Sequence, residues 1–379
     1  MLNPEFWHQR KVMITGCTGF KGAWLSIWLH KLGACVTGFA LEPDGERNLF
    51  RQCRLDRFVN TIYGDVRNYG KFKWALEEAS PEIIIHMAAQ PIVRESYRNP
   101  LKTYATNVMG TVHLFEAVRK VNDHKRQVLA VLNVTTDKCY ENREWIWGYR
   151  ENEPLGGSDP YSSSKACSEL VTSSYRNSFF SSERYAEHGV AVASARAGNV
   201  IGGGDWAADR LIPDCVRAVM EGRPLELRYP DAVRPWQHVL DPLYGYMLLA
   251  EKLATVGPEF AEAWNFGPGE DELQTVEWMA GRFCKAWGEG VSYRNQDNRP
   301  ELHESRLLRL DCSKAMGRLG WRSLWHAGQS VDKVVEWTKG YMQKEDPYDI
   351  CLRQIEQYTN ELADNSHSNQ LMYQEARRT

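Results

Sequence analysis

The chain has 379 residues, of which 43% are hydrophobic and 25% are charged, and its formal net charge at pH 7 is −3. This balance excludes a nucleic-acid binder that works by bulk positive charge, and no stretch reaches the roughly 20 apolar residues of a membrane-spanning helix. The length predicts about two or three domains, or one large α/β unit with an insertion. The N-terminus lacks the apolar core of a signal peptide, so we expect a cytoplasmic protein with neither a nucleic acid nor a membrane as partner.

The first half of the chain alternates short apolar runs with helical patterns. Strands are predicted over 11–15, 35–41, 58–63, 82–86, 127–135 and 189–195. Helices are predicted over 20–32, 69–78, 101–119 and 161–175. Because the strand runs are continuously apolar and alternate with helices, they predict an α/β fold with a doubly wound parallel sheet covered on both faces.

The second half has shorter elements and turns rich in glycine and proline, which predict a smaller C-terminal α/β domain for substrate. We expect a dinucleotide-binding domain over 1–195, with the segment of about 236–266 as a candidate to return to it. The substrate domain then covers mainly 196–343, and 344–379 forms a polar extension.

The end of this extension, from residue 365 onward, is predicted to be a loosely held tail because it is polar. The alternative is one more amphipathic helix, whose apolar positions would be Ile350, Leu352, Ile355 and Leu362.

The nine cysteines are scattered singly along the chain, without a C-x-x-C pair. Such a set in a chain of this size favours free buried thiols over a disulfide framework or a zinc site. We therefore expect no bound metal.

Three glycines, Gly16, Gly19 and Gly22, follow the first predicted strand and open the first predicted helix. Glycines there let backbone amides approach a pyrophosphate, which the N-terminus of a helix favours electrostatically. A plain tight turn is the alternative, but the flanking strand and helix favour a dinucleotide site.

Carboxylates beyond the glycine turn bear on the identity of the dinucleotide. Glu42 is placed to accept a hydrogen bond from an adenosine ribose, and Asp44 is its rival. Either carboxylate favours NAD over NADP, although Arg47 could accept a 2′-phosphate. Asp65, after the third strand, is placed to meet the adenine amino group, with a loop-capping role as the alternative.

Tyr161 and Lys165 are four residues apart and so share one face of a predicted helix. A nearby cation stabilises a phenolate, so this pair predicts a tyrosine of lowered pKa that takes a proton from a sugar hydroxyl. The lysine can also bind a nicotinamide ribose. A solvated surface pair is the alternative, and the glycine turn upstream disfavours it.

Six motifs occur together over about residues 10–340. They are Gly16-x-x-Gly19-x-x-Gly22, Gly64-Asp65-Val66, His86-Met-Ala88-Ala89-Gln90, Asn107-Val-x-Gly110-Thr, Tyr161-x-x-x-Lys165 and Arg196-Ala-Gly-Asn199-Val. In this order they resemble the extended short-chain dehydrogenase/reductase superfamily of nucleotide-sugar enzymes. The resemblance implies a Rossmann-type domain that binds NAD and a C-terminal domain that holds a nucleoside diphosphate sugar.

The resemblance also implies which residues contact NAD. They are Gly16, Thr18, Gly19, Phe20, Gly22, Asp65, Val66, Ala88, Ala89, Gln90, Asn107, Tyr161 and Lys165. For Asn107, a bond to the backbone that shapes the site and an ordinary helix cap are both open.

Thr136, Asp137 and Lys138 follow the fifth predicted strand, at the edge of the sheet where ligands collect. An adjacent acid and base imply a second proton-transfer task, such as loss of water from a sugar. Solvated charges at a strand end are the alternative. In dTDP-glucose 4,6-dehydratases the corresponding pair is Asp-Glu, so Lys138 departs from that pattern. The segments 136–145, 147–151, 156–161, 196–206 and 234–239 are similar to the CDP-glucose 4,6-dehydratases, where Asp-Lys is the norm.

This resemblance implies a reaction in three stages on CDP-glucose, with no net redox. Tyr161 removes the proton of the sugar O4 while hydride passes from C4 to NAD, with Thr136 bound to O4 and Lys165 holding the phenolate. Asp137 as acid and Lys138 as base then eliminate water across C5 and C6. Hydride returns to C6 and leaves a 4-keto-6-deoxy sugar, which the resemblance places in deoxysugar synthesis for a bacterial lipopolysaccharide O-antigen.

The substrate candidates lie in the second half of the chain. Arg234 is the best one for the diphosphate, because a guanidinium suits phosphate geometry, and Asn199 is expected to hydrogen-bond the diphosphate or the sugar. Arg196, Trp206 and His238 are weaker candidates, and a structural role for His238 is equally open.

Rival functions are a 4,6-dehydratase of another nucleotide sugar, an NAD-dependent nucleotide-sugar 4-epimerase and a non-catalytic NAD sensor. The Asp137–Lys138 pair disfavours the epimerase, and the intact proton-transfer residues disfavour the sensor. The long helices over 101–119 and 161–175 resemble the pair that forms a four-helix dimer interface in this superfamily. We therefore expect a homodimer or a dimer of dimers.

Overall fold

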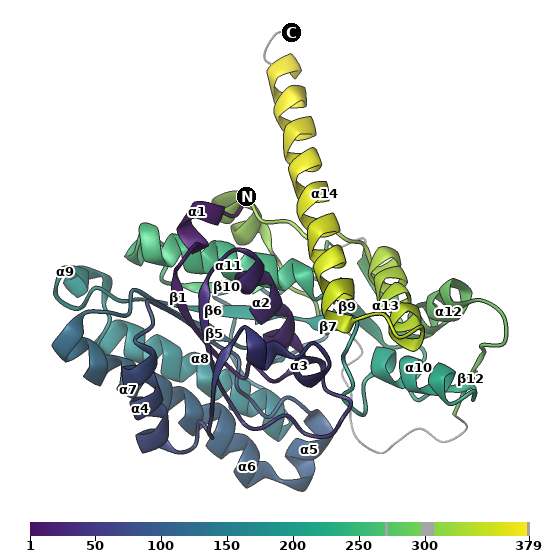
Figure 1. Ribbon diagram of the computed structural model, residues 1–379, viewed down its shortest axis with the longest axis horizontal. Helices are drawn as coiled ribbons and strands as arrows, with labels where there is room; N and C mark the ends of the chain where they lie inside the picture. The colour runs from purple at the N-terminus through teal and green to yellow at the C-terminus, as the bar shows by residue number, and fades with distance from the viewer. Residues whose placement is uncertain (270–271, 297–306, 377–379) are drawn as a thin grey trace.

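The computed structural model describes residues 1–269, 272–296 and 307–376. Within these ranges the centre of the molecule is a seven-stranded sheet with helices packed around it (Figure 1). The strand order is β3-β2-β1-β4-β5-β6-β10. All neighbouring strands in it are parallel. Its strands are β1 (Lys11–Thr15), β2 (Cys35–Ala40), β3 (Asn60–Tyr63), β4 (Ile83–His86), β5 (Ala130–Val134), β6 (Ala191–Ala197) and β10 (Ala263–Phe266).

Helices cover both faces of the sheet. Along β1, Val12 and Ile14 pack into one apolar cluster with α2 and α11, whereas Met13 packs into a second cluster with α4 and α7. Successive strand side chains point to opposite faces, so continuously apolar strands need two covers. The helices are α2 (Phe20–Lys31), α4 (Tyr69–Ala79), α7 (Gly110–Lys125), α8 (Pro160–Ser178) and α11 (Leu240–Thr255). The predicted doubly wound parallel architecture is confirmed.

The predicted helix over 101–119 is divided into three pieces: α6 (Pro100–Tyr104), a π-helical segment (Ala105–Met109) and α7. A separate short helix, α5 (Val93–Arg98), precedes them. The π-helical segment contains the buried Asn107. Segments of this kind are frequent at functional sites.

The smaller lobe is built from short strands. A three-stranded sheet joins β7 (Asn199–Ile201), β9 (Val233–His238) and β11 (Leu273–Thr275), and β8 (Leu225–Leu227) pairs with β12 (Tyr293–Asn295). Helices α10 (Leu211–Met220), α12 (Val276–Trp287) and α13 (Ala327–Met342) pack around its own apolar cluster. Short helices elsewhere are α1 (Pro4–Trp7), α3 (Leu49–Gln52) and α9 (Tyr185–His188), with 3-10 turns at Leu55–Arg57, Asp137–Cys139, Ser182–Arg184 and Pro258–Phe260 and a further π turn at Ala315–Leu319.

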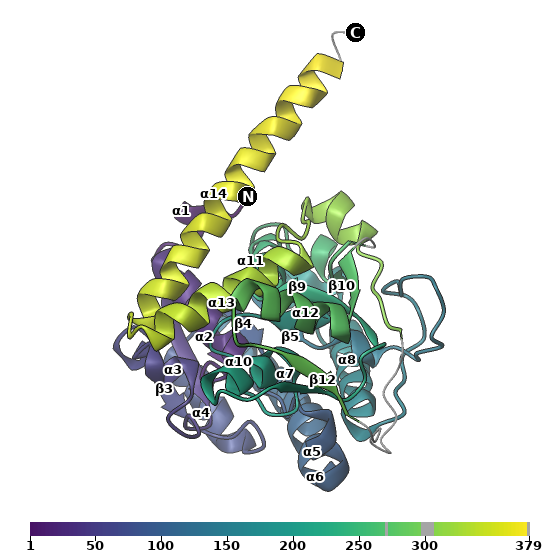
Figure 2. The same cartoon turned by 90° about the vertical axis from the view of Figure 1, so that its right-hand side faces the viewer.

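Helix α14 (Pro347–Ala376) contradicts the expected loose tail, because the chain from 365 to 376 is helical. Its first half is the amphipathic helix that was the alternative: Ile350 and Ile355 are fully buried in the main core. The second half runs out from the body of the molecule (Figure 2). The apolar stripe holds the helix only along the part that touches α2, α3 and α13.

The segment of about 236–266 contributes α11 and β10 to the large sheet side. The proposed division into domains at 195 and 343 stays a prediction.

Candidate active site

A cleft lies at the carboxyl ends of the sheet strands, between the sheet and the smaller lobe. It is the edge at which ligands bind in open α/β sheets. Lining residues include Phe20, Lys21, Thr136, Asp137, Lys138, Tyr161, Asn199 and Arg234. The structure therefore brings the predicted catalytic residues together, with Lys165 one helical turn beyond Tyr161.

The turn between β1 and α2 fits a dinucleotide pyrophosphate. Gly16 has a φ of +75°, and a Cβ there would lie 2.9 Å from the amide nitrogen of Ala88. A Cβ on Gly22 would lie 2.2 Å from the carbonyl oxygen of Gly16, so only glycine lets α2 begin this close to the turn. Gly19 is the N-cap of α2 and has no side chain to cover the helix amides. These amides can bind an anion.

The adenosine end of the predicted site lies beyond the strands β2 and β3. Thr18 Oγ1 donates to the carbonyl oxygen of Leu41 at 3.0 Å and ties the glycine turn to the end of β2. Glu42 and Asp44 are both exposed just after it, so the choice between them stays open. Asp65 accepts bonds from the backbone and guanidinium of Arg67, which lower its pKa. These are the contacts of a loop-capping carboxylate, and one face of it remains exposed.

The loop after β4, with Ala88, Ala89 and Gln90, is held from two sides. Thr15 Oγ1 accepts from the amides of Met87 and Ala88 at 3.1 Å each. Asn107 accepts from the Gln90 amide at 2.8 Å and donates to the Gln90 carbonyl at 3.1 Å and to Ser164 Oγ at 2.9 Å. Because Asn107 lies inside a helical run, a cap role is wrong, and its side chain joins the loop to α8. Val66, also predicted to contact the cofactor, is buried nearby under Gly110.

Tyr161 and Lys165 share one face of α8, as the spacing predicts. Burial raises the pKa of Tyr161 to about 12, while a hydrogen bond with Thr136 acts to lower it. The predicted lowering of this pKa is therefore wrong for the protein alone. Burial of the phenol is the cause. Lys165 donates to the carbonyl oxygen of Val134 at 3.0 Å, and burial lowers its own pKa to about 8.

Asp137 and Lys138 form a 3-10 turn directly after β5. Burial raises the pKa of Asp137, and the charge of the adjacent Lys138 offsets this only in part. Thr136 Oγ1 donates to Asp137 Oδ1 at 3.0 Å. Lys138 is partly exposed into the cleft. A carboxyl group with a raised pKa is suited to donate a proton.

Lys21 is a cleft residue that the motif reading did not single out. It lies between Gly19 and Gly22, and its positive charge was the one feature of the sequence that could have indicated a role in the cleft. Loss of solvation lowers its pKa to about 7, and the positive charges of Lys165 and Arg210 act in the same direction. Asp137 and Asp205 oppose them. The cleft therefore holds more ionisable groups than the motifs indicate.

The five predicted substrate residues divide into two groups. Asn199 and Arg234 line the cleft. Arg196 does not: it is 3% exposed, its guanidinium donates to Glu169 Oε2 at 2.8 Å, and it also bonds Tyr140. It is a core residue, because its strand β6 is buried on both faces.

His238 and Trp206 are also away from the cleft lining. His238 is fully buried, packs edge-on against Trp24 and Trp325, and its pKa is lowered to about 3 by burial. Trp206 donates to Gln52 Oε1 at 3.0 Å and packs against Trp337 and Tyr341. The contacts of His238 with Trp24 and Trp325 are those of a structural residue, which was one of its two predicted roles.

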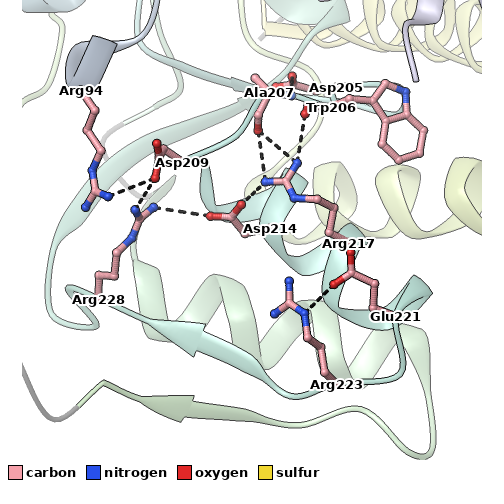
Figure 3. A network of polar contacts seen from close by, with 10 residues as sticks. All are labelled: Arg94, Asp205, Trp206, Ala207, Asp209, Asp214, Arg217, Glu221, Arg223 and Arg228. Carbon is pink, nitrogen blue, oxygen red and sulfur yellow. Dashed lines mark hydrogen bonds and ion pairs between the residues drawn. The ribbon is translucent and has the colours of Figure 1, made fainter. Parts of the chain in front are cut away.

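A network of charged side chains lies at the lobe end of the cleft (Figure 3). Asp209 accepts from Arg94 Nη1 at 3.1 Å and from Arg228 Nη1 at 2.8 Å. Asp214 pairs with Arg228 at 3.5 Å and with Arg217. Motif reading did not find these residues, because no local pattern links positions so far apart in the chain.

The sequence matches the profile of the family described as GDP-mannose 4,6 dehydratase over residues 13–334. The chain belongs to this family. Among its relatives, the CDP-glucose 4,6-dehydratase of Salmonella typhimurium strain LT2 is 49% identical over 94% of this chain and 98% of the relative. A dTDP-glucose 4,6-dehydratase of Xanthomonas campestris pv. campestris is 25% identical over 86% of this chain and 92% of the relative.

Solved structures show the same fold for this dehydratase-family chain. A dTDP-glucose 4,6-dehydratase from Bacillus anthracis, in complex with NAD, has a TM-score of 0.71 at 21% identity and covers 89% of this chain and 99% of its own. DesIV, a dTDP-glucose 4,6-dehydratase from Streptomyces venezuelae with NAD and TYD bound, has a TM-score of 0.71 at 24% identity, with coverages of 89% and 99%.

None of the helices in the described ranges has the length and apolar character to span a membrane. No group of three or more His, Cys, Asp or Glu side chains in these ranges could hold a metal ion.

Proposed function

We propose that this chain is an NAD-dependent lyase that converts CDP-D-glucose to CDP-4-dehydro-6-deoxy-D-glucose and water. The observation that carries the proposal is that one cleft holds two proton-transfer sets side by side: Thr136 with Tyr161, and Asp137 with Lys138. An oxidation at C4 needs only the first set, and an elimination needs the second. The 49% identity to a CDP-glucose 4,6-dehydratase supports both the reaction and the nucleotide.

The glycine turn, the N-terminus of α2 and the loop held by Asn107 are the residues that would bind NAD. When bound, NAD takes a hydride from the sugar C4 and later returns it to C6. Gly16, Gly19 and Gly22 would hold its pyrophosphate, and Lys165 on α8 would contact its ribose.

Tyr161 and Thr136 carry out the first proton transfer. Thr136 holds the sugar O4 by a hydrogen bond, and Tyr161 accepts the O4 proton as C4 becomes a ketone. With its pKa raised to about 12, Tyr161 needs a positive charge nearby to act as phenolate at neutral pH. The ammonium group of Lys165 and the guanidinium group of Arg210 are available to supply this charge. The charge of Arg210 already acts to lower the pKa of Tyr161.

Asp137 and Lys138 carry out the elimination. The ketone at C4 acidifies the proton on C5, which Lys138 removes, and Asp137 protonates the departing hydroxyl of C6. A Lys138→Ala variant should therefore reduce bound NAD on addition of CDP-glucose but release no water, which absorbance at 340 nm and product mass measure separately. Normal turnover by this variant would overturn the assignment of Lys138.

The proposed reaction is tested by incubating the protein with NAD and, in parallel, CDP-glucose, UDP-glucose and dTDP-glucose. Loss of one water from CDP-glucose, seen by mass spectrometry, is the expected result. Loss of water only from another nucleotide sugar would overturn the substrate and keep the reaction. An isomer of unchanged mass would indicate a 4-epimerase instead.

We further propose that two copies associate through helices α5, α6 and α8. Large apolar side chains are exposed there: Tyr97, Leu101, Tyr104 and Leu170, with Leu101 83% exposed. Clustered apolar exposure of this kind marks an interaction surface. Light scattering should give the mass of a dimer or a dimer of dimers, and a Leu101→Glu, Leu170→Glu variant should be monomeric. We place the enzyme in the cytoplasm, where free thiols such as its cysteines stay reduced.

A further inference from the structure

The cleft continues from the catalytic residues into the smaller lobe and ends among apolar side chains. Ile212 on α10 and Leu225 and Leu227 on β8 line this end and are nearly fully buried. Arg234, the diphosphate candidate, lines the cleft as well. A nucleotide sugar whose reacting sugar contacts Tyr161 and whose diphosphate contacts Arg234 would therefore place its base at this apolar end.

Two charged side chains line the same end and face each other. Asp214 lies in the first turn of α10, and Arg228 follows β8 directly. Arg228 Nη2 and Asp214 Oδ2 are 3.5 Å apart, and the side chains are 24% and 30% exposed. At this distance the two groups are paired only loosely, so each keeps hydrogen-bonding capacity for a ligand.

Each of the two side chains is fixed from behind by a second ion pair (Figure 3). Asp209 accepts from Arg228 Nη1 at 2.8 Å, and Asp209 is itself held at 3.1 Å by Arg94 from the sheet side of the cleft. The other oxygen of Asp214 pairs with Arg217, one turn further along α10. The acceptor of Asp214 and the donors of Arg228 are thus positioned before a ligand arrives, which reduces the entropic cost of binding.

A carboxylate that faces position 4 of the ring, with a guanidinium that faces N3 or O2, complements cytosine and opposes uracil and thymine. The pairing edge of cytosine has an amino group at C4, which donates, and N3 and O2, which accept. Carboxylates recognise the cytosine amino group, whereas uracil and thymine present an oxygen at C4 and an N–H at position 3. We infer that Asp214 and Arg228 select the cytosine base of the substrate, Asp214 accepting from its amino group and Arg228 donating to N3 or O2. This inference rests on the proposed function.

The test measures base selectivity in binding and in turnover. The dissociation constants of CDP and UDP are measured by calorimetry, and kcat/KM is measured for CDP-glucose and UDP-glucose. The variants Asp214→Asn and Arg228→Gln should each lower the preference for CDP over UDP about 10- to 100-fold. In Asp214→Asn, the new amide can also donate a hydrogen bond to the oxygen at C4 of uracil. Arg223→Gln serves as the matched control, because Arg223 pairs with Glu221 on the surface of the same lobe. It should keep the preference.

The outcomes separate the inference from the proposed function. If CDP and UDP lose affinity by the same factor, the pair binds the diphosphate and base selection is overturned. If the wild type prefers CDP-glucose and both variants keep that preference, the inference fails while the function stands. If the wild type dehydrates none of the nucleotide glucoses, the proposed function fails. The ratio of the dissociation constants of CDP and UDP then still tests whether Asp214 and Arg228 select the base. Melting temperatures identify a variant that is misfolded. The result for the other variant then decides whether the inference holds.

Discussion

The two sides of the cleft are built in different ways. On the sheet side, the catalytic residues follow buried regular elements: Thr136, Asp137 and Lys138 come directly after β5, and Tyr161 begins α8. On the lobe side, the cleft is lined by side chains from α10, from β9 and from the three-residue strands β7 and β8 with the residues that follow them, and ion pairs hold Asp214 and Arg228 in place. Regular backbone thus positions the chemistry, whereas a side-chain network positions the binding groups.

This difference explains what the sequence could predict. Continuous apolar runs such as Ile83–Ile85, which alternate with helical patterns, indicate parallel strands covered on both faces, so the sheet, its parallel direction and the catalytic edge could be predicted from the pattern. Asn199 and Arg234 were found through their motifs. Asp209, Asp214 and Arg228 were not, because the pairs among them and with Arg94 join residues 14 to 115 positions apart in the chain.

Burial also decided where prediction failed. Arg196 and His238 lie in motifs that predict substrate contacts, but both side chains are buried in the core. A motif shows that a residue matters without showing which way its side chain points. In α14, the polar composition indicated a loose tail. A few apolar residues in its first half, Ile350 and Ile355 among them, nevertheless pack into the main core.

The largest effect should come from the sheet side. Tyr161→Phe removes the only hydroxyl that exchanges a proton with O4 in the proposed mechanism, so kcat should fall about 10²- to 10⁴-fold. The dissociation constant of CDP should stay the same, because the nucleotide lies on the lobe side. Stopped-flow reduction of NAD and calorimetry measure the two quantities. A weakened affinity for CDP would break the division between the two sides.

A buried ion pair on the sheet side should govern stability. Although burial acts to raise it, the pKa of Glu169 is lowered overall by Arg196 and by bonds from Ser194 and Thr135. Glu169→Gln leaves Arg196 buried without its counter-charge, and the free energy of unfolding should fall by about 3–5 kcal/mol. Chemical denaturation checks this. Glu187→Gln, which removes an exposed pair with Arg184, is the control and should change little.

The same carboxylate should make stability depend on pH. A depressed folded-state pKa gives stability that is present above the ordinary glutamate range and is lost as pH falls through the folded-state pKa. The wild type should therefore lose more stability than Glu169→Gln on acidification below about pH 4. Equal losses in the two proteins would assign the acid sensitivity to other carboxylates.

A lobe-side change should act on binding rather than on chemistry. Arg234→Gln removes a guanidinium from the expected diphosphate site, so KM for CDP-glucose should rise about 10- to 100-fold while kcat changes little. Initial-rate kinetics give both values. Arg223→Gln is again the control, because its guanidinium lies outside the cleft lining. A fall in kcat with unchanged KM would show that the lobe side also takes part in the chemistry.

The smallest effect concerns the pH dependence of the first proton transfer. Burial lowers the pKa of Lys165 to about 8, so this lysine loses its charge as pH rises through that value. The neutral amine no longer favours the phenolate of Tyr161, and kcat should decline above about pH 8 on that account. Lys165→Arg keeps a positive charge at alkaline pH, so the decline should move upward or disappear even if the variant is several-fold slower at its optimum. An unchanged alkaline decline of kcat in Lys165→Arg would show that the ionisation of another group causes the decline. Lys21, whose pKa is lowered to about 7, is such a group. The controlling group would then lie in the glycine turn sequence and not on α8.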